Sequence, residues 1–568
     1  MKRFFPILEW LPNYSKALFR GDLIAGLTVG FILIPQGMAY AVIAEIPAEY
    51  GLYTALVPPV VYAILGTSKK LSIGPVAIDS LLVASTIGGL SVSDPQALIP
   101  LAMLLAFMVG ITQFLLGSLK MGFLANFLSS PVINGFTSAT AIVIALNQVR
   151  YLLGIELPRS TRIHQLLLGI FDQVKELHLL TFVFAIVVLL VLYSFRFINK
   201  RIPSSLLVMI GAITLVVIFN WDQNGLEVVG TIPKGLPGFR VPPFTEVPWK
   251  DMLPMALTIG LIGFTESYSL SRKFQQEDPN YEIEANQELR ALGLTNTIGS
   301  FFQSYVATSS FSRTAVNAEN GANTSLSGVF AAIMVAMVLL FLTSPFEILP
   351  MCVLAAIIFV AVLRLVDFKT PKRLWKTYRA EFWLLTITFI STGFIGIIEG
   401  IAIGVVMSLL FMVFRTAKPH MAVLGNVGGH YKNIGRFPDA IQRNDVLAVR
   451  FDGQLYYANQ QYFDDQVRQL IIEKGKQLEL FVLNAENINY IDATAGAMVS
   501  QLIKDLRMEK IEFRLAGAIG PVRDALKRSK IINDIGEENC FVKTGDAIAH
   551  YDDPKNVSNQ YIARQAGE

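Results

Sequence analysis

Long apolar runs without a single charge constrain the fold of this chain more than any other feature. A helix that crosses the hydrocarbon core of a bilayer needs about 20 mostly apolar residues. Uncharged runs of that length or longer occupy residues 23–44, 97–119, 121–149, 202–221 and 320–346. The chain is 53% hydrophobic and only 16% charged, whereas about a quarter of the residues in a soluble globular protein are charged. The sequence therefore predicts a polytopic helical membrane protein.

The pattern changes from about His420 onward. Short β-type runs at 446–451, 478–483 and 511–516 alternate there with charged, helix-patterned segments. This alternation predicts a small α/β domain in the aqueous phase. We expect a transmembrane domain at 1–418, a linker at 419–440, an α/β domain at 441–555 and a polar tail at 556–568.

The placement of Lys and Arg predicts the orientation, because cytoplasmic joints carry an excess of both. If the N-terminus is cytoplasmic, one side receives the basic joints at 69–70, 120, 196–201, 272–273 and 369–379. The joint that carries Arg150, Arg159 and Arg162 disagrees, because it would lie outside. We expect a multi-pass protein of the cell (inner) membrane with both termini in the cytoplasm.

Two segments are too interrupted or too polar to be ordinary spans: SIGPVAIDS at 72–80 and YVATSSFSRTAVNAENGANTSL at 305–326. Pro75 suits the first turn of a helix, and the serines at 309–312 are candidate caps. The unpaired N–H groups and positive dipole end of a helix start bind anions. Arg313 would add a cation with several donors for an oxyanion. The alternative is that both segments are kinks or re-entrant loops without a ligand.

Glu266 is the next unusual residue, because an ionisable group inside a span is costly and normally faces an internal cavity. Gly260, Gly263 and Glu266 recur every three residues, which predicts small residues and a carboxyl group on one helix face. Desolvation favours the protonated form of a carboxyl group, so Glu266 could carry a proton. The alternative is an interfacial glutamate that ends the span just before Arg272 and Lys273.

Several ordered motifs extend over almost the whole chain. They are IPQGMAYAVIAEIPAEYGLYTALVPPVVYAILGTSKKLSIGPVA at 34–77, SSPVINGFTSATAIVIALNQVRYLLGI at 129–155, GFTES at 263–267, NQELRALGLTNTIGSFF at 286–302 and SSFSRTAVN at 309–317. In these motifs the sequence resembles the SulP family of anion transporters, which carry a C-terminal STAS domain. The resemblance implies fourteen membrane segments as two inverted seven-segment repeats, divided into core and gate domains. The third and tenth segments would be half-helices that face one another across an anion site.

The resemblance also assigns roles to residues and implies a homodimer that works by an elevator motion. Glu266 matches an acid linked to proton coupling in many members of the family. The residues expected to line the anion site are Gln36, Tyr40, Pro75, Val76, Ala77, Phe311, Ser312 and Arg313.

Asp79 departs from the family pattern, in which an apolar residue is usual at this position. Three interpretations compete. Asp79 could pair with Arg313 and reduce the positive charge of the site. It could be a second titratable or cation-coupling group. It could also make a polar contact between helices and have no effect on substrate.

The C-terminal domain resembles STAS domains in INYIDATAGAMVSQLIKDL at 488–506. Anti-sigma-factor antagonists carry a phosphorylatable serine directly after the aspartate of this motif, and here Ala493 takes its place. Phosphorylation there is therefore not expected, and Thr494 is a weak substitute. We expect a domain that supports folding and dimerisation, with a cytoplasmic partner as the alternative.

Together these features predict a secondary active transporter that takes up sulfate or a related oxyanion with protons. Sodium-coupled bicarbonate or fumarate-like dicarboxylate transport is the nearest alternative, followed by an anion channel and a membrane-anchored regulator. The chain has no GxxxxGK[ST] loop and no metal-ligand spacing among its five histidines. We therefore expect no enzyme activity, no cofactor, no metal and no nucleic-acid partner.

Overall fold

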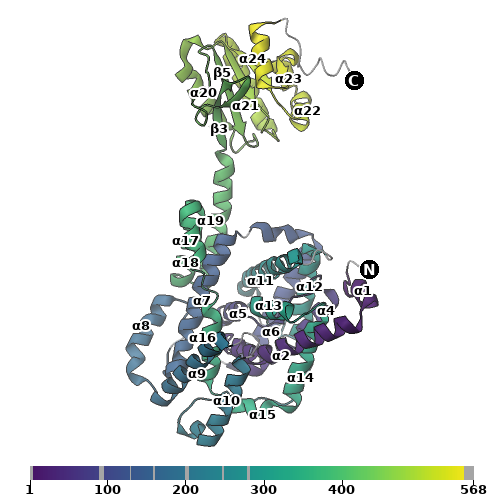
Figure 1. The fold of residues 1–568 in the computed structure, drawn as a ribbon, viewed down its shortest axis with the longest axis vertical. Coiled ribbons are helices and arrows are strands. Elements are labelled where there is room, and N and C mark those ends of the chain that lie inside the picture. The colour runs from purple at the N-terminus through teal and green to yellow at the C-terminus, as the bar shows by residue number, and fades with distance from the viewer. Residues whose placement is uncertain are drawn as a thin grey trace. The chain divides into compact units, whose positions relative to one another are not determined.

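A computed structural model describes residues 4–88, 95–127, 129–157, 160–198, 204–245, 248–277 and 282–554. The chain divides into two compact units, Met1–Ser408 and Leu409–Glu568. The first unit is helical and the second combines a sheet with helices (Figure 1).

The first half of the helical unit alternates long and short helices with one two-residue strand. Its main elements are α1 (Ile7–Trp10), α2 (Lys16–Ile43), α3 (Ala48–Thr54), α4 (Val57–Leu65), β1 (Ile73–Gly74), α5 (Ala77–Gly88), α6 (Pro95–Ser118), α7 (Ser130–Leu153), α8 (Ile163–Gln173), α9 (Leu179–Ile198) and α10 (Ser204–Phe219).

The second half repeats the order in which a two-residue strand precedes a short helix. Its main elements are α11 (Trp249–Glu277), α12 (Ala285–Ser300), β2 (Thr308–Ser309), α13 (Phe311–Glu319), α14 (Leu326–Phe341), α15 (Thr343–Glu347), α16 (Met351–Leu363), α17 (Lys369–Thr377), α18 (Arg379–Phe394) and α19 (Ile397–Ala417). β1 with α5 and β2 with α13 are therefore corresponding elements of the two halves.

Most of the uncharged runs form helices close to their expected bounds, but the run at 121–149 does not form one span. It is divided into a 3₁₀ helix, Met121–Phe127, and α7, which begins at Ser130. Pro131 stands in the first turn of α7, where a proline is tolerated because its missing N–H has no partner in the helix anyway. A new helix thus begins within this run, and the hydropathy of the run does not show it because the residues on both sides of the break are apolar.

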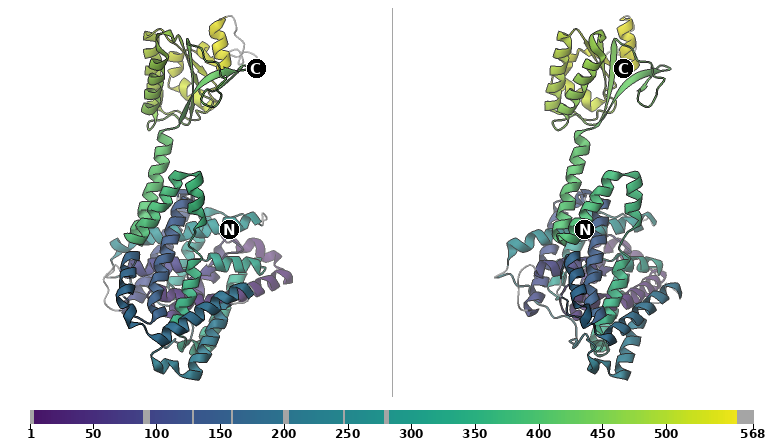
Figure 2. Two further views of the ribbon diagram at one scale, coloured as in Figure 1. Left: turned by 60° about the vertical axis from the view of Figure 1, so that its left-hand side comes forward. Right: turned by 90° about the vertical axis from the view of Figure 1, so that its left-hand side faces the viewer.

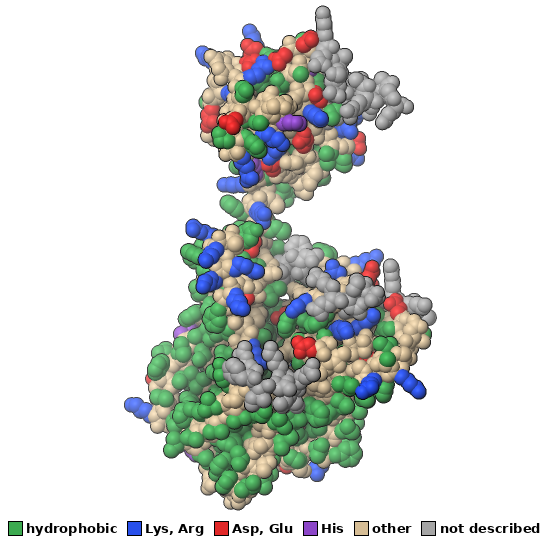
Figure 3. Space-filling view, viewed as in Figure 1, with side chains coloured by type: hydrophobic (Ala, Val, Ile, Leu, Met, Phe, Trp, Pro, Cys, Tyr) green, Lys and Arg blue, Asp and Glu red, His purple; other side chains and the backbone are tan. Residues whose placement is uncertain are grey.

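Apolar side chains cover much of the visible surface of the helical unit (Figure 3). Large apolar side chains such as Leu190, Ile218 and Phe341 are 61%, 62% and 77% exposed. Soluble proteins rarely expose apolar patches of this extent, whereas lipid tails cover them at no cost. The long apolar helices and this surface support a multi-pass membrane protein.

The C-terminal unit is built on a six-stranded sheet in the order β4-β3-β5-β6-β7-β8. Its strands are β3 (His420–Val427), β4 (His430–Asn433), β5 (Val446–Asp452), β6 (Leu480–Asn484), β7 (Glu512–Ala516) and β8 (Cys540–Phe541). β3 is antiparallel to both of its neighbours, and β5 to β8 are parallel. The expected runs at 446–451, 478–483 and 511–516 correspond to β5, β6 and β7.

Helices cover both faces of this sheet (Figure 2). Leu447 and Val449 of β5 pack in the cluster that contains α20 (Gln460–Lys474), α21 (Ala493–Met508), α22 (Gly520–Arg528) and α23 (Ile531–Ile535). Val446 and Ala448 point the other way and pack with α24 (Thr544–Asp552). This alternation follows from the two-residue period of a strand.

The expected linker at 419–440 differs from the structure, because β3 and β4 lie within it and both are paired in the sheet. Gly428 and Gly429, which lie between the two strands, have positive φ values of 57° and 86°. They form the turn of a hairpin, a conformation that glycine adopts readily. The expected tail at 556–568 lies outside the described residues.

Candidate anion-binding site

Two short strands join the interrupted segments that the sequence singled out. β1 and β2 are antiparallel, with Ile73 opposite Ser309 and Gly74 opposite Thr308. The pairing extends to Ser310, whose N–H donates to the carbonyl of Ser72 at 3.1 Å. Because α5 and α13 begin just after these strands, the pairing brings two helix starts from distant parts of the sequence together.

Each helix start presents N–H groups that have no carbonyl partner within the helix. Ser310 caps α13, since its Oγ accepts from the N–H of Arg313 at 3.5 Å. In α5, the N–H of Ser80 donates to the carbonyl of Val76 at 2.9 Å. The backbone N–H groups that precede Ser80 make no hydrogen bond within this first turn. Two positive helix ends in one place favour a negatively charged ligand.

Arg313 is fully buried between these helix starts. Its Nε donates to Ser72 Oγ and its Nη1 to Gln36 Oε1, both at 3.4 Å. Its Nη2 is buried without a hydrogen-bond partner. None of the ion pairs found within 4.0 Å in the described part of the chain includes Arg313. A buried cation without a carboxylate partner is costly by itself and can bind an anion.

α2 forms the third wall of this site. Gln36 and Tyr40, one turn apart on α2, are 8% and 5% exposed. Gly37 lets α2 approach closely, because a Cβ there would lie 3.1 Å from the carbonyl oxygen of Gly51 and 3.7 Å from Pro75 Cγ. The structure thus gathers Gln36, Pro75 and Arg313 as expected, with Ala77 buried at the first position of α5.

Val76, Phe311 and Ser312 lie on a more open side of the site. Val76 is half-buried, Ser312 is exposed, and Phe311 is 56% exposed. The Lys273 ammonium lies over the Phe311 ring at 4.8 Å from its centroid. The start of α13 therefore combines an accessible aromatic ring with a buried arginine two residues later.

Gly74 offers a test of the geometry around Arg313. Its φ is 152°, and a Cβ there would lie 3.4 Å from Arg313 Nη2. We expect Gly74→Ala to lower anion affinity several-fold, because the methyl group strains the strand and crowds the free guanidinium nitrogen. Equilibrium anion binding to purified protein measures this effect. Gly211→Ala on α10, where a Cβ meets nothing within 4 Å, is the matched control, and equal affinities in both variants would contradict the assignment.

Asp79 is fully buried and contacts β2 rather than Arg313. The hydroxyl of Thr308 donates to Asp79 Oδ2, whereas Oδ1 is buried without a hydrogen-bond partner. Within the described residues Asp79 forms no ion pair with Arg313. The structure therefore supports a polar contact between segments and leaves one carboxylate oxygen available to a further group.

Glu266 lies on α11. It lines a small pocket with Val132, Ile133 and Phe136 of α7 and Ile401 of α19. α11 continues past Glu266 to Glu277, so Glu266 does not end the span as an interfacial residue would. The carboxyl group instead stands where three helices meet inside the unit.

The expected common face of Gly260, Gly263 and Glu266 is wrong, because steps of three residues rotate around a helix with 3.6 residues per turn. A Cβ on Gly260 would meet Gln113 of α6 at 3.3 Å, whereas one on Gly263 would meet Thr308 of β2 at 2.6 Å. Gly263 still matters for the site, since its missing side chain lets β2 and Asp79 approach α11.

Several residues that support the site were not expected from the sequence. Ser72 accepts from Arg313 and donates its N–H to Thr314 Oγ1 at 3.0 Å. Buried Glu288 on α12 accepts from the Tyr62 hydroxyl at 2.8 Å and from the N–H of Thr67 at 2.7 Å. The sequence offered one signal for Glu288, which is a carboxylate within the segment NQELRALGLTNTIGS. A carboxylate needs hydrogen-bond partners when it is buried.

The fold is that of a multi-pass helical membrane protein with a buried cation between two helix starts. Residues 19–388 match the sulfate permease family and residues 437–547 match the STAS domain. The chain belongs to the sulfate permease family and carries a C-terminal STAS domain.

Curated relatives match along nearly the whole chain. Sulfate transporter 4.1, chloroplastic, from Arabidopsis thaliana is 35% identical over 582 residues, which cover 98% of this chain and 84% of the relative. Probable sulfate transporter 4.2 from the same plant is 36% identical over 96% of this chain and 84% of its own length.

Solved structures confirm the fold. The murine Slc26a9 anion transporter in the inward-facing state superimposes with a TM-score of 0.90 at 24% identity, covering 97% of this chain and 94% of that one. The transmembrane domain of a cyanobacterial bicarbonate transporter, BicA, matches with a TM-score of 0.60 at 22% identity, over 70% of this chain and 98% of its own. The predicted class, a helical transmembrane region followed by a STAS domain, is confirmed.

Proposed function

We propose that this protein is a secondary active transporter that takes up sulfate or a related oxyanion together with protons. The observation that carries the proposal is the buried Arg313, whose Nη2 has no partner, between two helix starts joined by β1 and β2. A tetrahedral oxyanion accepts several hydrogen bonds at once, which suits a guanidinium group and converging N–H donors. The names of the curated relatives support sulfate as the first anion to test.

An elevator motion is the transport mechanism that we propose, with the site carried by one set of helices. α2, α4, α6, α12, α13 and α14 pack against one another around the site, and α7, α9, α16 and α18 form a second packed set. Glu266 belongs to α11, which packs on the first set, and it faces α7 and α19. Sliding of one set past the other would change the surroundings of Glu266, which supports its role as the proton carrier.

Sodium-coupled transport of bicarbonate or a dicarboxylate is the second candidate, and Asp79 is the observation that favours it. Asp79 Oδ1 is buried without a partner, beside the hydroxyl of Thr308 that already binds Oδ2. Carboxylate and hydroxyl oxygens are ligands for hard cations. An uncompensated carboxylate in this position could be neutralised either by a proton or by sodium.

We expect Asp79→Val to change the preference of uptake among sulfate, bicarbonate and fumarate or its response to sodium, because the variant removes a buried charge beside the site. Asp79→Asn keeps an acceptor for Thr308 and thus separates the loss of charge from the loss of the hydrogen bond. Competition ratios in vesicles measure the preference. Identical ratios in the wild type and both variants would leave the contact with Thr308 as the only role of Asp79.

The deciding experiment is uptake of radiolabelled sulfate into proteoliposomes of the full chain. It is run with and without an inward proton gradient, with and without sodium, and with unlabelled bicarbonate and fumarate as competitors. Saturable uptake that the proton gradient raises and sodium leaves unchanged supports the proposal. Uptake that requires sodium, or that only bicarbonate or fumarate competes for, moves the assignment to the second candidate. Conductance without saturation would indicate an anion channel.

We also propose that the protein is a homodimer of the inner membrane with cytoplasmic termini, and that its STAS domain stabilises the dimer. Asp492 caps α21 by accepting from the N–H of Ala495 at 2.8 Å, and Ala493 follows at the first helical position. Without a hydroxyl group at residue 493, the helix start offers no phosphorylation site there. This arrangement supports a structural role for the domain over a phosphorylation switch.

A further inference from the structure

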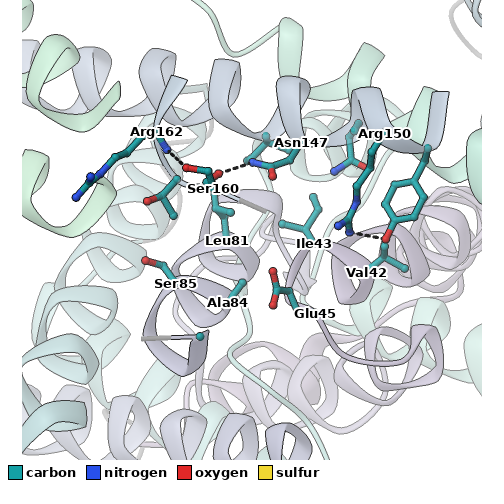
Figure 4. Close-up of a pocket in the computed structure, with 15 residues that line it drawn as sticks. Val42, Ile43, Glu45, Leu81, Ala84, Ser85, Asn147, Arg150, Ser160 and Arg162 are labelled. Atoms are coloured by element: carbon teal, nitrogen blue, oxygen red, sulfur yellow. Dashed lines mark hydrogen bonds between the residues drawn. The ribbon is translucent and has the colours of Figure 1, made fainter. Parts of the chain in front are cut away.

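A second polar cavity lies beside the C-terminal parts of α2, α5 and α7 (Figure 4). Its volume is about 460 Å³, which is in the range of ligand-binding pockets. It shares no lining residue with the site around Arg313. A cavity of this size accommodates a small oxyanion with several water molecules, since each water occupies about 30 Å³.

Helix faces that form the anion site continue into this cavity. On α2, Gln36 and Tyr40 are followed on the same face by Ile43, which lines the cavity. On α5, Leu81 and Ser85 line it at positions four and eight residues after Ala77. With a rise of about 1.5 Å per residue, Ser85 lies about 12 Å along the helix from Ala77. The cavity is thus one or two helical turns from the site.

Polar groups from α7 and the segment after it form the opposite wall. Figure 4 shows Arg150 directed into the cavity and Arg162 at its edge. Arg150 donates to the hydroxyl of Tyr151 at 2.6 Å, and its guanidinium lies 4.4 Å from the centroid of the Tyr151 ring. Arg162 Nε donates to the carbonyl of Ile395 at 2.8 Å. These contacts hold both cations at the cavity.

With the remaining polar residues of its lining included, the cavity has a net positive charge. Asn147 fixes the segment that carries Arg162, because its amide donates to the carbonyl of Ser160 at 2.8 Å. Gln148 Oε1 is buried without a hydrogen-bond partner. Glu45 also lines the cavity (Figure 4). One carboxylate against two guanidinium groups gives the lining an excess of one positive charge.

This cavity also accounts for the basic joint that contradicts the predicted orientation. If the N-terminus is cytoplasmic, the C-terminal ends of α2 and α7 are external, and so are Arg150 and Arg162. Lys and Arg normally accumulate on the cytoplasmic side, so two arginines outside need another reason. Arg159, the third basic residue of the joint, lies outside the described residues.

We propose that the cavity is a second anion site on the outer side, where Arg150 and Arg162 attract an inorganic oxyanion before it reaches Arg313. The proposal rests on the proposed anion uptake and on the predicted orientation. Clefts of one charge sign raise the local concentration of an oppositely charged ligand and its association rate. The cavity thereby supplies anions from outside to the site around Arg313, and it takes no part in the proton-coupled step.

A cysteine in the cavity tests its charge and its side without requiring transport. Ser85→Cys places a thiol on the cavity wall, and both native cysteines, Cys352 and Cys540, are buried. Intact cells are treated from outside with a sulfonate-bearing or a trimethylammonium-bearing thiosulfonate reagent. We expect the anionic reagent to react about tenfold faster after correction for its rate with a free thiol, and external sulfate to slow the reaction.

Charge variants then identify the source of this preference. Arg150→Gln in the Ser85→Cys background is expected to abolish it, and Arg150→Lys to restore most of it. Lys234→Gln is the control, because Lys234 is an exposed cation of the external joint after Trp221 and does not line the cavity. Equal rates for the two reagents, or labelling only from the cytoplasmic side, would overturn the proposal.

Transport kinetics provide the second readout. Arg150→Gln is expected to raise KM for external sulfate about tenfold, to leave the maximal rate within about twofold and to weaken the dependence of uptake on ionic strength. Anion binding from the cytoplasmic side should be unchanged. If the protein does not transport sulfate but the anionic reagent still reacts preferentially, the proposed substrate fails and the external site stands. An unchanged KM with normal transport refutes the external site alone.

Discussion

Replacing Arg313 by alanine is expected to weaken sulfate binding by about 10- to 100-fold, because hydrogen bonds to charged groups contribute about 1.5–3 kcal/mol. The guanidinium group is fully buried, and only Nε and Nη1 are used, by Ser72 and Gln36. The alanine variant also removes the only full positive charge that we place between the two helix starts. Equilibrium binding to purified protein and stabilisation of the protein by sulfate against thermal unfolding both measure the loss.

Two further variants separate binding from folding. Arg313→Lys keeps the charge but not the planar fork of donors, so we expect an intermediate affinity. Arg272→Gln is the control for charge, because Arg272 is exposed and its Nη1 donates to Gln275 at 2.9 Å. Thermal unfolding without sulfate reports whether each variant is folded. A folded Arg313→Ala protein with the affinity of the wild type would show that Arg313 does not bind the substrate.

Local chemistry was sufficient to predict that helices begin within the two interrupted segments. A proline and a group of serines indicated the starts of α5 and α13, and the charge-free runs indicated most of the remaining helices. Spacing along the chain could not show that Gly74 pairs with Thr308, because a strand of two residues has no pattern to read. The resemblance to a known family implied only that the two half-helices face one another, and it did not include the pairing of the strands that precede them.

Other parts of the prediction were wrong because the local sequence is compatible with more than one backbone structure. Residues 419–440 were expected to form a linker, yet Gly428 and Gly429 form the turn between two paired strands there. Hydropathy alone merged Met121–Phe127 with α7, because a helix break inside an apolar run leaves its composition unchanged. Buried polar partners such as Thr308 for Asp79 depend on packing between distant segments, which periodicity does not encode.

In the mechanism that we propose, Glu266 and Arg313 perform two different tasks, proton coupling and anion binding. Arg313 lies with Gln36 and Ser72 within the site, whereas Glu266 lies in a pocket lined by α7 and α19. α11 links the two, because Ser267 Oγ accepts from the N–H of Ser309 at 3.3 Å directly beside Glu266 in the chain. In the proposed mechanism, this carboxyl group responds to movement of α7 and α19 relative to α11.

Glu266→Gln is therefore expected to abolish accumulation of sulfate driven by a proton gradient and to leave exchange of sulfate for sulfate largely intact. Glutamine has nearly the same size and can occupy the pocket, but it cannot take up and release a proton. Both activities are measured in the same proteoliposomes, with and without a pH difference across the membrane. Glu284→Gln is the control, because Glu284 is exposed before α12.

The comparison of the two activities separates coupling from binding. A variant that loses both has lost the site or the fold, and sulfate binding to the purified protein then tells which. Accumulation that survives in Glu266→Gln would show that another group carries the proton. Asp79 would be the first residue to test, because its Oδ1 is buried without a partner and a Cβ on Gly263, one turn before Glu266, would lie 3.9 Å from it. Proton transfer would then occur next to the anion, and coupling would follow from charge neutralisation within the site itself.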